Sequence, residues 1–113
     1  MQRTNNMTPT ALKTATPEVW FCWALDQFNL FYHAPRPGIS RGDTVKDWIP
    51  RFERWLATGA ANRRVRTVAQ SLLRSWNDEI RVEGAGDLWT EYGGMDDTNR
   101  AGVRRVLEHV RYF

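Results

Sequence analysis

The chain has 113 residues, of which 42% are hydrophobic and 26% charged, which is the balance of an ordinary globular domain. Its length fits one domain, and its single cysteine excludes an internal disulfide framework and a zinc site built from several cysteines. The formal net charge is +3, and fourteen of the sixteen basic residues are arginine, which prefers phosphate, carboxylate and aromatic partners.

The N-terminal part of the chain divides into a tail and a strongly apolar helix. Residues 1–15 are polar, threonine-rich and aperiodic, so we expect a flexible tail there and a single helical domain over 16–113. The Thr-Pro-Glu sequence at 16–18 is typical of a helix start, since it supplies a capping hydroxyl, a proline and an acid. We expect a helix over about 17–33, which a proline-rich stretch then stops.

The helix predicted over 17–33 is apolar around most of its circumference. Such a helix is either central to the fold or buried against a partner, and the other predicted helices are too short to cover it fully. We therefore expect some of its aromatic residues to stay exposed, which favours a homo-oligomer or a subunit of a larger complex. The candidates are Trp20, Phe31 and Tyr32.

Apolar residues at helical spacing predict three more helices, over about 45–57, 61–81 and 97–112. Pro50 fits the first turn if its helix begins near Asp47, whereas it should kink a helix that begins at Thr44. The positions expected to be largely buried are Trp23, Phe28, Trp48, Phe52, Leu72, Trp76, Val106 and Leu107.

Glycines and acidic residues separate the last two predicted helices. Gly84, Gly86, Gly93 and Gly94 interrupt the pattern, and over residues 80–94 we favour an irregular loop with a short helical turn rather than a small hairpin. The predicted fold class is therefore all-α: a single small helical bundle of about four helices with a glycine-rich acidic loop before the last helix.

Charge is unevenly distributed along the chain. Residues 51–74 carry six arginines and one glutamate, residues 78–97 carry seven acidic residues and one arginine, and residues 100–113 carry four arginines and one glutamate. On a helical wheel, a stripe about 80° wide gathers polar and basic side chains over about 27 Å of the helix predicted for 61–81. The stripe consists of Arg63, Arg66, Gln70, Arg74, Asn77 and Arg81.

A row of guanidinium groups at this spacing suits a phosphate backbone, and Arg100, Arg104 and Arg111 of the last predicted helix add to it. The alternative is a solvated arginine face whose positive charge complements the acidic segment of the same molecule. That segment carries Trp89 and Tyr92, which are candidate anchors for a protein partner. The segment could equally mimic the charge of DNA to a basic partner, or Leu88 and Trp89 could simply plug the open end of the bundle.

Sequence signals of catalysis and cofactor binding are absent. The chain has neither a phosphate-binding glycine loop nor a calcium-loop spacing, and its two histidines have no nearby nucleophile or ligand set. Cys22 lies in the most apolar helix and is expected to be an inert core thiol. We therefore expect a non-enzymatic protein without a metal or cofactor. Because we find no signal peptide and no apolar run long enough for a bilayer, we expect a cytoplasmic protein with no membrane partner.

Two function classes remain. The first is a small basic helical protein that binds nucleic acid through backbone contacts, as a subunit of a larger nucleoprotein complex such as a CRISPR-type effector. The second is a protein–protein interaction module, such as an adaptor or a phage- or plasmid-encoded inhibitor of a nucleic-acid enzyme. The arginine-rich helices favour the first class, whereas the aromatic excess and the acidic loop favour the second.

Overall fold

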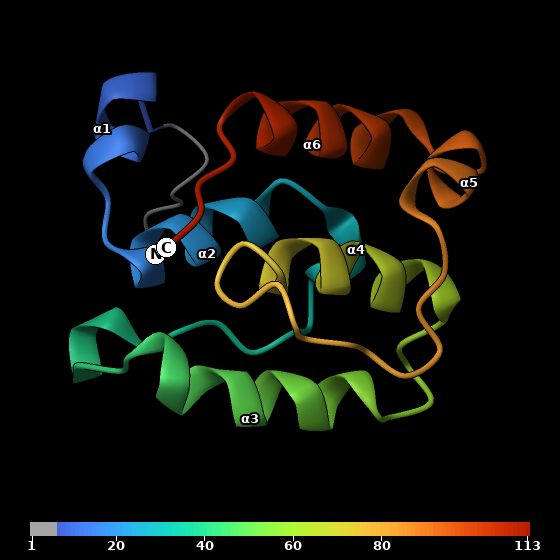
Figure 1. The fold of residues 1–113 in the computed structure, drawn as a ribbon, viewed down its shortest axis with the longest axis horizontal. Helices are drawn as coiled ribbons and strands as arrows, with labels where there is room; N and C mark the ends of the chain where they lie inside the picture. The colour runs from blue at the N-terminus through green and yellow to red at the C-terminus, as the bar shows by residue number, and fades with distance from the viewer. Residues whose placement is uncertain (1–6) are drawn as a thin grey trace.

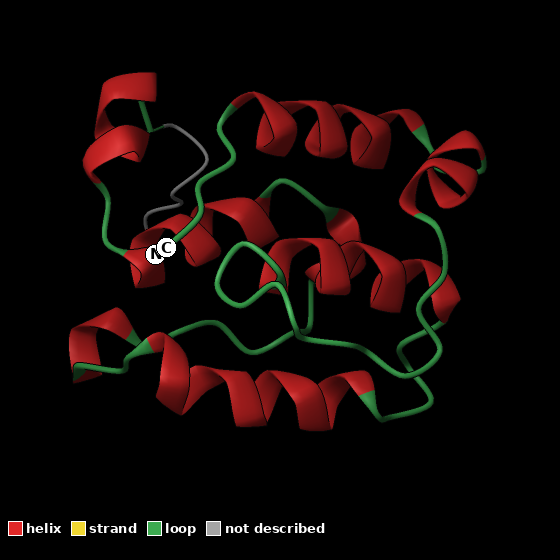
Figure 2. Cartoon of the chain, viewed as in Figure 1, coloured by secondary structure: helices red, strands yellow, loops and turns green. Residues whose placement is uncertain are grey.

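The computed structural model describes residues 7–113, so residues 1–6 of the predicted tail lie outside it. Within that range the chain is helical and forms no strand, which confirms the all-α prediction (Figures 1 and 2). Two short 3₁₀ helices, η2 (Asn29–Phe31) and η3 (Ile39–Arg41), accompany the α-helices. The α-helices are α1 (Pro9–Thr14), α2 (Pro17–Asp26), α3 (Val45–Leu56), α4 (Arg63–Leu73), α5 (Leu88–Gly93) and α6 (Asp97–Glu108).

The second half of the predicted tail is ordered as α1. The Thr8 hydroxyl caps this helix by accepting a hydrogen bond from the amide of Ala11 at 3.1 Å. Leu12 is 2% exposed and belongs to the core, and the Arg111 guanidinium donates to its carbonyl at 3.0 Å. One buried leucine produces no periodic pattern, which is why the sequence alone suggests a tail there.

α2 starts where the sequence predicts and ends seven residues early. The Thr16 hydroxyl accepts a hydrogen bond from the amide of Val19 at 3.3 Å, as expected for the cap. The helix stops at Asp26, and Phe28 has an extended backbone before the chain continues as η2. This break turns Phe28 and Phe31 into the core, where their rings meet edge to face at 5.6 Å. A segment that is apolar all round gives no sign of where it bends.

α3 agrees closely with its prediction. Thr44 and Asp47 form a complete capping box, so the helix begins at Val45 and runs through Pro50. Its buried face includes Trp48, whose ring stacks on Phe52 at 4.8 Å. The alternative start near Asp47 is therefore wrong, and Pro50 lies inside the helix rather than in its first turn.

α4 ends at Leu73, eight residues before the predicted end. Residues 74–87 instead form turns and irregular backbone that fold back over the helix, followed by α5. Side chains of α4 hold this segment: Gln70 Oε1 accepts from the Val82 amide at 2.8 Å, and the Thr67 hydroxyl accepts from the Gly86 amide at 2.7 Å. Residues 80–94 form no strand, which contradicts the hairpin alternative.

The core lies between α3 and α6, which run along opposite edges of the fold with α2 and α4 between them (Figure 1). Six of the eight positions expected to be buried are at most 6% exposed, but Trp76 is only half-buried and Leu107 is 44% exposed. Trp76 misses the core because it lies in the turn after α4. Leu107 misses it because α6 ends at Glu108, which leaves Leu107 at the border of the buried face.

Candidate interaction surface

The predicted arginine stripe is not one continuous row. Arg63, Arg66 and Gln70 lie on α4, but Arg74 is its C-cap residue. Asn77 and Arg81 lie in the turns that follow α4 and no longer obey its helical spacing. The assumption of a straight helix from 61 to 81 is therefore wrong.

Most of these side chains bind groups of their own chain. Arg66 Nε donates to the carbonyl of Leu56 at 3.1 Å, and Arg74 Nε donates to the carbonyl of Asp78 at 3.0 Å. Arg81 donates to the same Asp78 carbonyl at 3.0 Å. Arg66 thus ties α4 to the end of α3, and Arg74 ties the end of α4 to the segment that follows it, so these arginines hold the fold as well as carrying charge.

Glycines of the acidic segment lie directly against guanidinium groups of α4. A Cβ atom at Gly84 would stand 2.8 Å from Arg66 Nη1, and one at Gly86 would stand 2.5 Å from Arg63 Nε. The acidic segment therefore covers part of the arginine face. This arrangement agrees with the alternative interpretation, and Arg63 and Arg64 also pair with the Glu91 carboxylate of that segment, at 3.8 and 3.3 Å.

The three basic residues predicted to extend the stripe point to different partners. Arg100 pairs with Asp97 at 2.8 Å. Arg104 donates to the Tyr92 hydroxyl at 2.7 Å. Arg111 follows the end of α6, where its guanidinium lies 4.5 Å from the centre of the Phe113 ring. Arg100 and Arg104 share a face of α6 but bind different groups, and Arg111 lies beyond the end of that helix.

Two of the three aromatic residues expected to be exposed are buried. Trp20 and Phe31 are both 0% exposed, so neither can contact a partner at the surface, whereas Tyr32 is 73% exposed. The chain end covers Trp20: its indole Nε1 donates to the His109 carbonyl at 3.0 Å, and its ring lies 5.9 Å from that of Phe113. The residues after α6 thus cover part of the apolar circumference of α2.

A different apolar surface is open between α4 and α6. Leu107 and Val110 are 44% and 40% exposed, and they border a cavity of about 50 Å³ whose lining is almost wholly apolar. We call this feature the α4–α6 groove. Its lining residues are Trp20, Phe28, Val68, Ser71, Leu72, Ser75, Leu88, Val103, Val106, Leu107 and Val110.

α5 closes one end of the α4–α6 groove. Its N-cap is Asp87, whose carboxylate accepts from the Thr90 amide at 2.9 Å, and this hydrogen bond lowers the pKa of the Asp87 carboxyl. Glu91 binds α5 to α4 through Arg64 at 3.3 Å. Tyr92 binds α5 to α6 through its hydroxyl, and Trp89, which is 59% exposed, packs on Tyr92 edge to face at 5.6 Å. The two predicted partner anchors thus lie beside the groove.

A second hollow, of about 420 Å³, lies between the C-terminal end of α3 and residues 81–83. Two arginines and two glutamates border it, so its lining favours neither an anionic nor a cationic ligand. The lining residues are Glu53, Leu56, Ala57, Arg66, Arg81, Val82 and Glu83.

Residues 7–113 hold few groups that could carry other chemistry. The side chains of that range bring together no group of three or more histidine, cysteine or acidic residues able to hold a metal ion. Cys22 is buried, and burial raises the pKa of its thiol to about 11, as expected for an inert core residue. No helix of the same range has both the length and the apolar character needed to cross a bilayer.

No protein-family model, curated protein or solved structure matches this chain.

Proposed function

We propose that this chain is a non-enzymatic protein–protein interaction module whose partner binds over the α4–α6 groove and α5. One observation carries the proposal: Leu107 and Val110 stay 44% and 40% exposed at the mouth of an apolar cavity that is also lined by Leu88, the sequence neighbour of Trp89, which is 59% exposed. Contiguous exposed apolar side chains mark binding surfaces more often than scattered ones do. Of the two classes that the sequence leaves open, this surface supports the interaction module.

The groove has the composition of a binding centre. Tryptophan and tyrosine are among the side chains most often found to dominate interface energies, and here the exposed Trp89 packs on the half-buried Tyr92 in the helix that closes one end of the groove. When a partner covers a half-exposed leucine or valine, the burial of that side chain contributes about 1 kcal/mol to the binding free energy. Trp89 contributes more binding free energy, because covering its side chain removes a larger apolar area from water.

The experiment compares partner capture by three forms of the full chain from extracts of its native host. Leu107→Glu places a charge in the groove and should remove a specific bound protein that the parent retains. Ile39→Glu is the matched control, since Ile39 is 46% exposed but lies in η3, which precedes α3 at the other edge of the fold (Figure 1). Thermal unfolding of all three forms verifies that each is folded.

Capture that is unchanged by Leu107→Glu, or lost equally with Ile39→Glu, contradicts the proposal. Light scattering on the purified parent decides whether the bound partner is a second copy. A concentration-dependent dimer that Leu107→Glu converts to a monomer would identify a homo-oligomer bound through this same surface.

Nucleic-acid binding is a second candidate because several exposed arginines have no carboxylate within ion-pair distance in residues 7–113. They are Arg54, Arg74, Arg81, Arg104 and Arg105. If they contact a phosphate backbone, log affinity should fall linearly with log salt, by about 0.7 to 0.9 for each contact. An electrophoretic shift assay at low salt tests this candidate, and absence of binding to both DNA and RNA refutes it.

A further inference from the structure

We infer that the hollow between the C-terminal end of α3 and residues 81–83 binds a small zwitterion with an apolar side chain, which is the chemistry of a free amino acid or a dipeptide. The hollow shares no lining residue with the α4–α6 groove, so the inference goes beyond the proposed function and is tested independently of it. It follows from the size of the hollow, from its partly apolar lining, and from the arrangement of four charges around it.

The hollow has the size of a small-molecule site and an apolar part. Its volume of about 420 Å³ falls within the range of about 300–1,000 Å³ that is usual for ligand pockets. Leu56, which is 3% exposed, forms the apolar part of the lining together with Ala57 and Val82. The Val82 amide donates to Gln70 Oε1 at 2.8 Å, so this side of the hollow is attached to α4. Such a lining favours a ligand that carries an apolar group of its own.

Four charged side chains of both signs border the same hollow. Arg66 and Arg81 are the cations, and Glu53 and Glu83 are the anions. Within residues 7–113, none of the four lies within ion-pair distance of an opposite charge. The formal charges of the lining therefore cancel in sum, yet each stays available to a ligand that carries both signs.

Backbone carbonyl groups hold the two guanidinium groups in place. Arg66 Nε donates to the Leu56 carbonyl at 3.1 Å. Arg81 Nη1 donates to the carbonyls of Asp78 and Ile80, both at 3.0 Å. Nε and Nη2 of Arg81, which form one edge of the guanidinium fork, bind no acceptor within residues 7–113. That edge matches the two oxygens of a carboxylate, and a group that is already held loses less freedom when a ligand binds.

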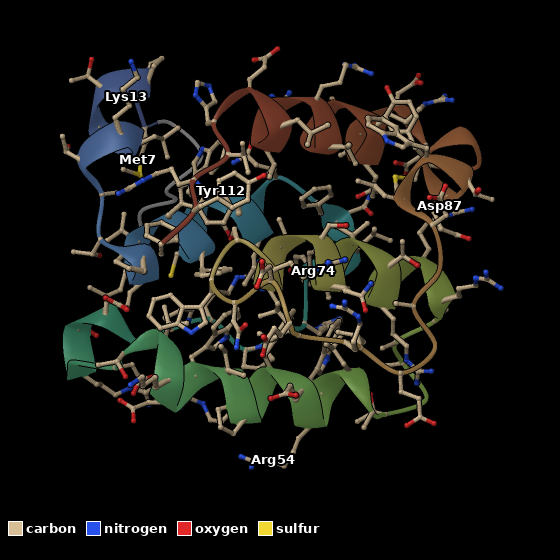
Figure 3. The ribbon with its side chains drawn as sticks, viewed as in Figure 1. Met7, Lys13, Arg54, Arg74, Asp87 and Tyr112 are labelled. Atoms are coloured by element: carbon tan, nitrogen blue, oxygen red, sulfur yellow. The ribbon has the colours of Figure 1, made fainter. Side chains whose placement is uncertain are left out.

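Other charges close in sequence lie outside this lining. Those within three positions of the four charged lining residues are either paired with a carboxylate or exposed. Figure 3 shows one of them, Arg54, pointing outward from α3 and away from the other helices. The balance of two positive and two negative groups is thus set by the lining alone. The paired residues are Arg51, Arg63 and Arg64, and the exposed ones are Arg54, Asp78 and Glu79.

The experiment is a titration of the isotope-labelled full chain with L-leucine, followed through the backbone amide signals in NMR spectra. We expect saturable shifts at residues 56–57 and 81–84, and none at Leu107. Leucinamide lacks the carboxylate and isocaproate lacks the ammonium group. Each should bind at least about tenfold more weakly than leucine, because each loses one charge-assisted contact.

A second arm distinguishes the two sources of this chemistry. Leucyl-leucine carries the same two charges and a second apolar side chain. Tighter binding than that of leucine assigns the hollow to short peptides, and weaker binding assigns it to free amino acids. Either result supports the inference, provided that the single-charge analogues bind more weakly.

Glutamine substitutions test the assigned charges. Glu53→Gln plus Glu83→Gln should weaken leucine binding at least about tenfold and leave isocaproate binding unchanged, since isocaproate has no positive group to lose a partner. Arg81→Gln should weaken leucine binding in the same way and leave leucinamide binding unchanged. Arg81 also holds two backbone carbonyls, whereas neither glutamate is in an ion pair within residues 7–113, so the glutamate variant tests the site without loosening the fold.

The matched controls replace exposed charges outside the lining. Glu79→Gln plus Glu108→Gln is the control for the glutamates, and Arg54→Gln is the control for the arginine. Both controls, and Leu107→Glu in the α4–α6 groove, should bind leucine as the parent does. Thermal unfolding verifies that every variant is folded.

Three results would overturn the inference. They are equal binding of leucine and its two single-charge analogues, leucine binding that the glutamate variant leaves unchanged, and the absence of saturable shifts with both leucine and leucyl-leucine up to their solubility limits. None of these results bears on the proposed function, which fails separately if capture from the host shows no partner that depends on Leu107.

Discussion

Gly102 is the point where α6 rests on the end of α2, and replacing it with alanine tests that contact. A Cβ atom at this position would stand 2.5 Å from the carbonyl oxygen of Gln27 and 2.9 Å from Cε1 of Phe28. The nearest atom belongs to the backbone and therefore cannot simply rotate away. Because α6 carries Leu107, and Val110 follows its C-terminal end, the position of α6 on α2 also affects the width of the α4–α6 groove.

Two opposing effects decide the size of the change. Replacing a helix-interior glycine with alanine normally stabilises by about 1 kcal/mol. Overpacking a tight core costs about 1–3 kcal/mol, and contact with a backbone oxygen favours the upper part of that range. We therefore expect Gly102→Ala to lower the free energy of unfolding by about 1–2 kcal/mol, which lowers Tm by about 4–8 °C.

Urea unfolding followed by tryptophan fluorescence measures this change. The control is Gly93→Ala in α5, since a Cβ atom at Gly93 would meet nothing within 4 Å. The control should be neutral or slightly stabilised. A Gly102→Ala variant as stable as the parent would refute the close approach of α6 to α2.

Three further predictions concern a hydrogen bond to the covering segment, the pH dependence of stability and the reactivity of the core thiol. Thr67→Val should lower the free energy of unfolding by about 1–3 kcal/mol in urea, because it leaves a backbone amide of the covering segment without its acceptor. Hydrogen bonds from backbone amides lower the pKa values of Asp43, Asp87 and Asp96, so stability should be full above pH ~4 and fall as the pH drops through these lowered values. Urea midpoints that stay constant from pH 6 to pH 2 would contradict that assignment. Cys22 should react with a thiol reagent at pH 8 far more slowly in the native protein than in denaturant, as absorbance assays can show.

Helix starts were predictable because their signals are local. Thr16 caps α2 and Thr44 caps α3, in each case by accepting an amide hydrogen bond from three residues along the chain. Asp96 starts α6 in the same way, through the amide of Asn99 at 2.9 Å. Such interactions require no knowledge of the rest of the fold.

Helix ends were harder because tertiary contacts set them. Neither glycine nor proline follows Leu73, and the apolar pattern continues through Trp76 and Ile80, so the sequence predicts a longer α4. The chain turns back there because Gln70 and Thr67 offer acceptors to the amides of residues 82 and 86. Pairing between segments twelve or more residues apart leaves no periodic trace in the sequence.

The sequence predicted only part of the candidate surface, because tertiary contacts also decide which apolar side chains stay exposed. Trp89 stands out in the sequence because it lies among glycines and acids, and it is exposed. Leu107 fits the apolar face of its helix and was therefore expected in the core. Only the early end of α6 and the open cavity beside it reveal that Leu107 lies at the surface.

Hydroxyl-radical footprinting of the chain in complex with its captured partner tests the central claim most directly, because it reads solvent access at single side chains. The account predicts that oxidation of Trp89 and Leu107 falls several-fold in the complex. Oxidation of Tyr32 and Ile39, which are 73% and 46% exposed away from the groove, should not change. Protection of Tyr32 and Ile39 with Trp89 and Leu107 still oxidised at the free-chain rate would contradict the assignment of the α4–α6 groove as the binding surface.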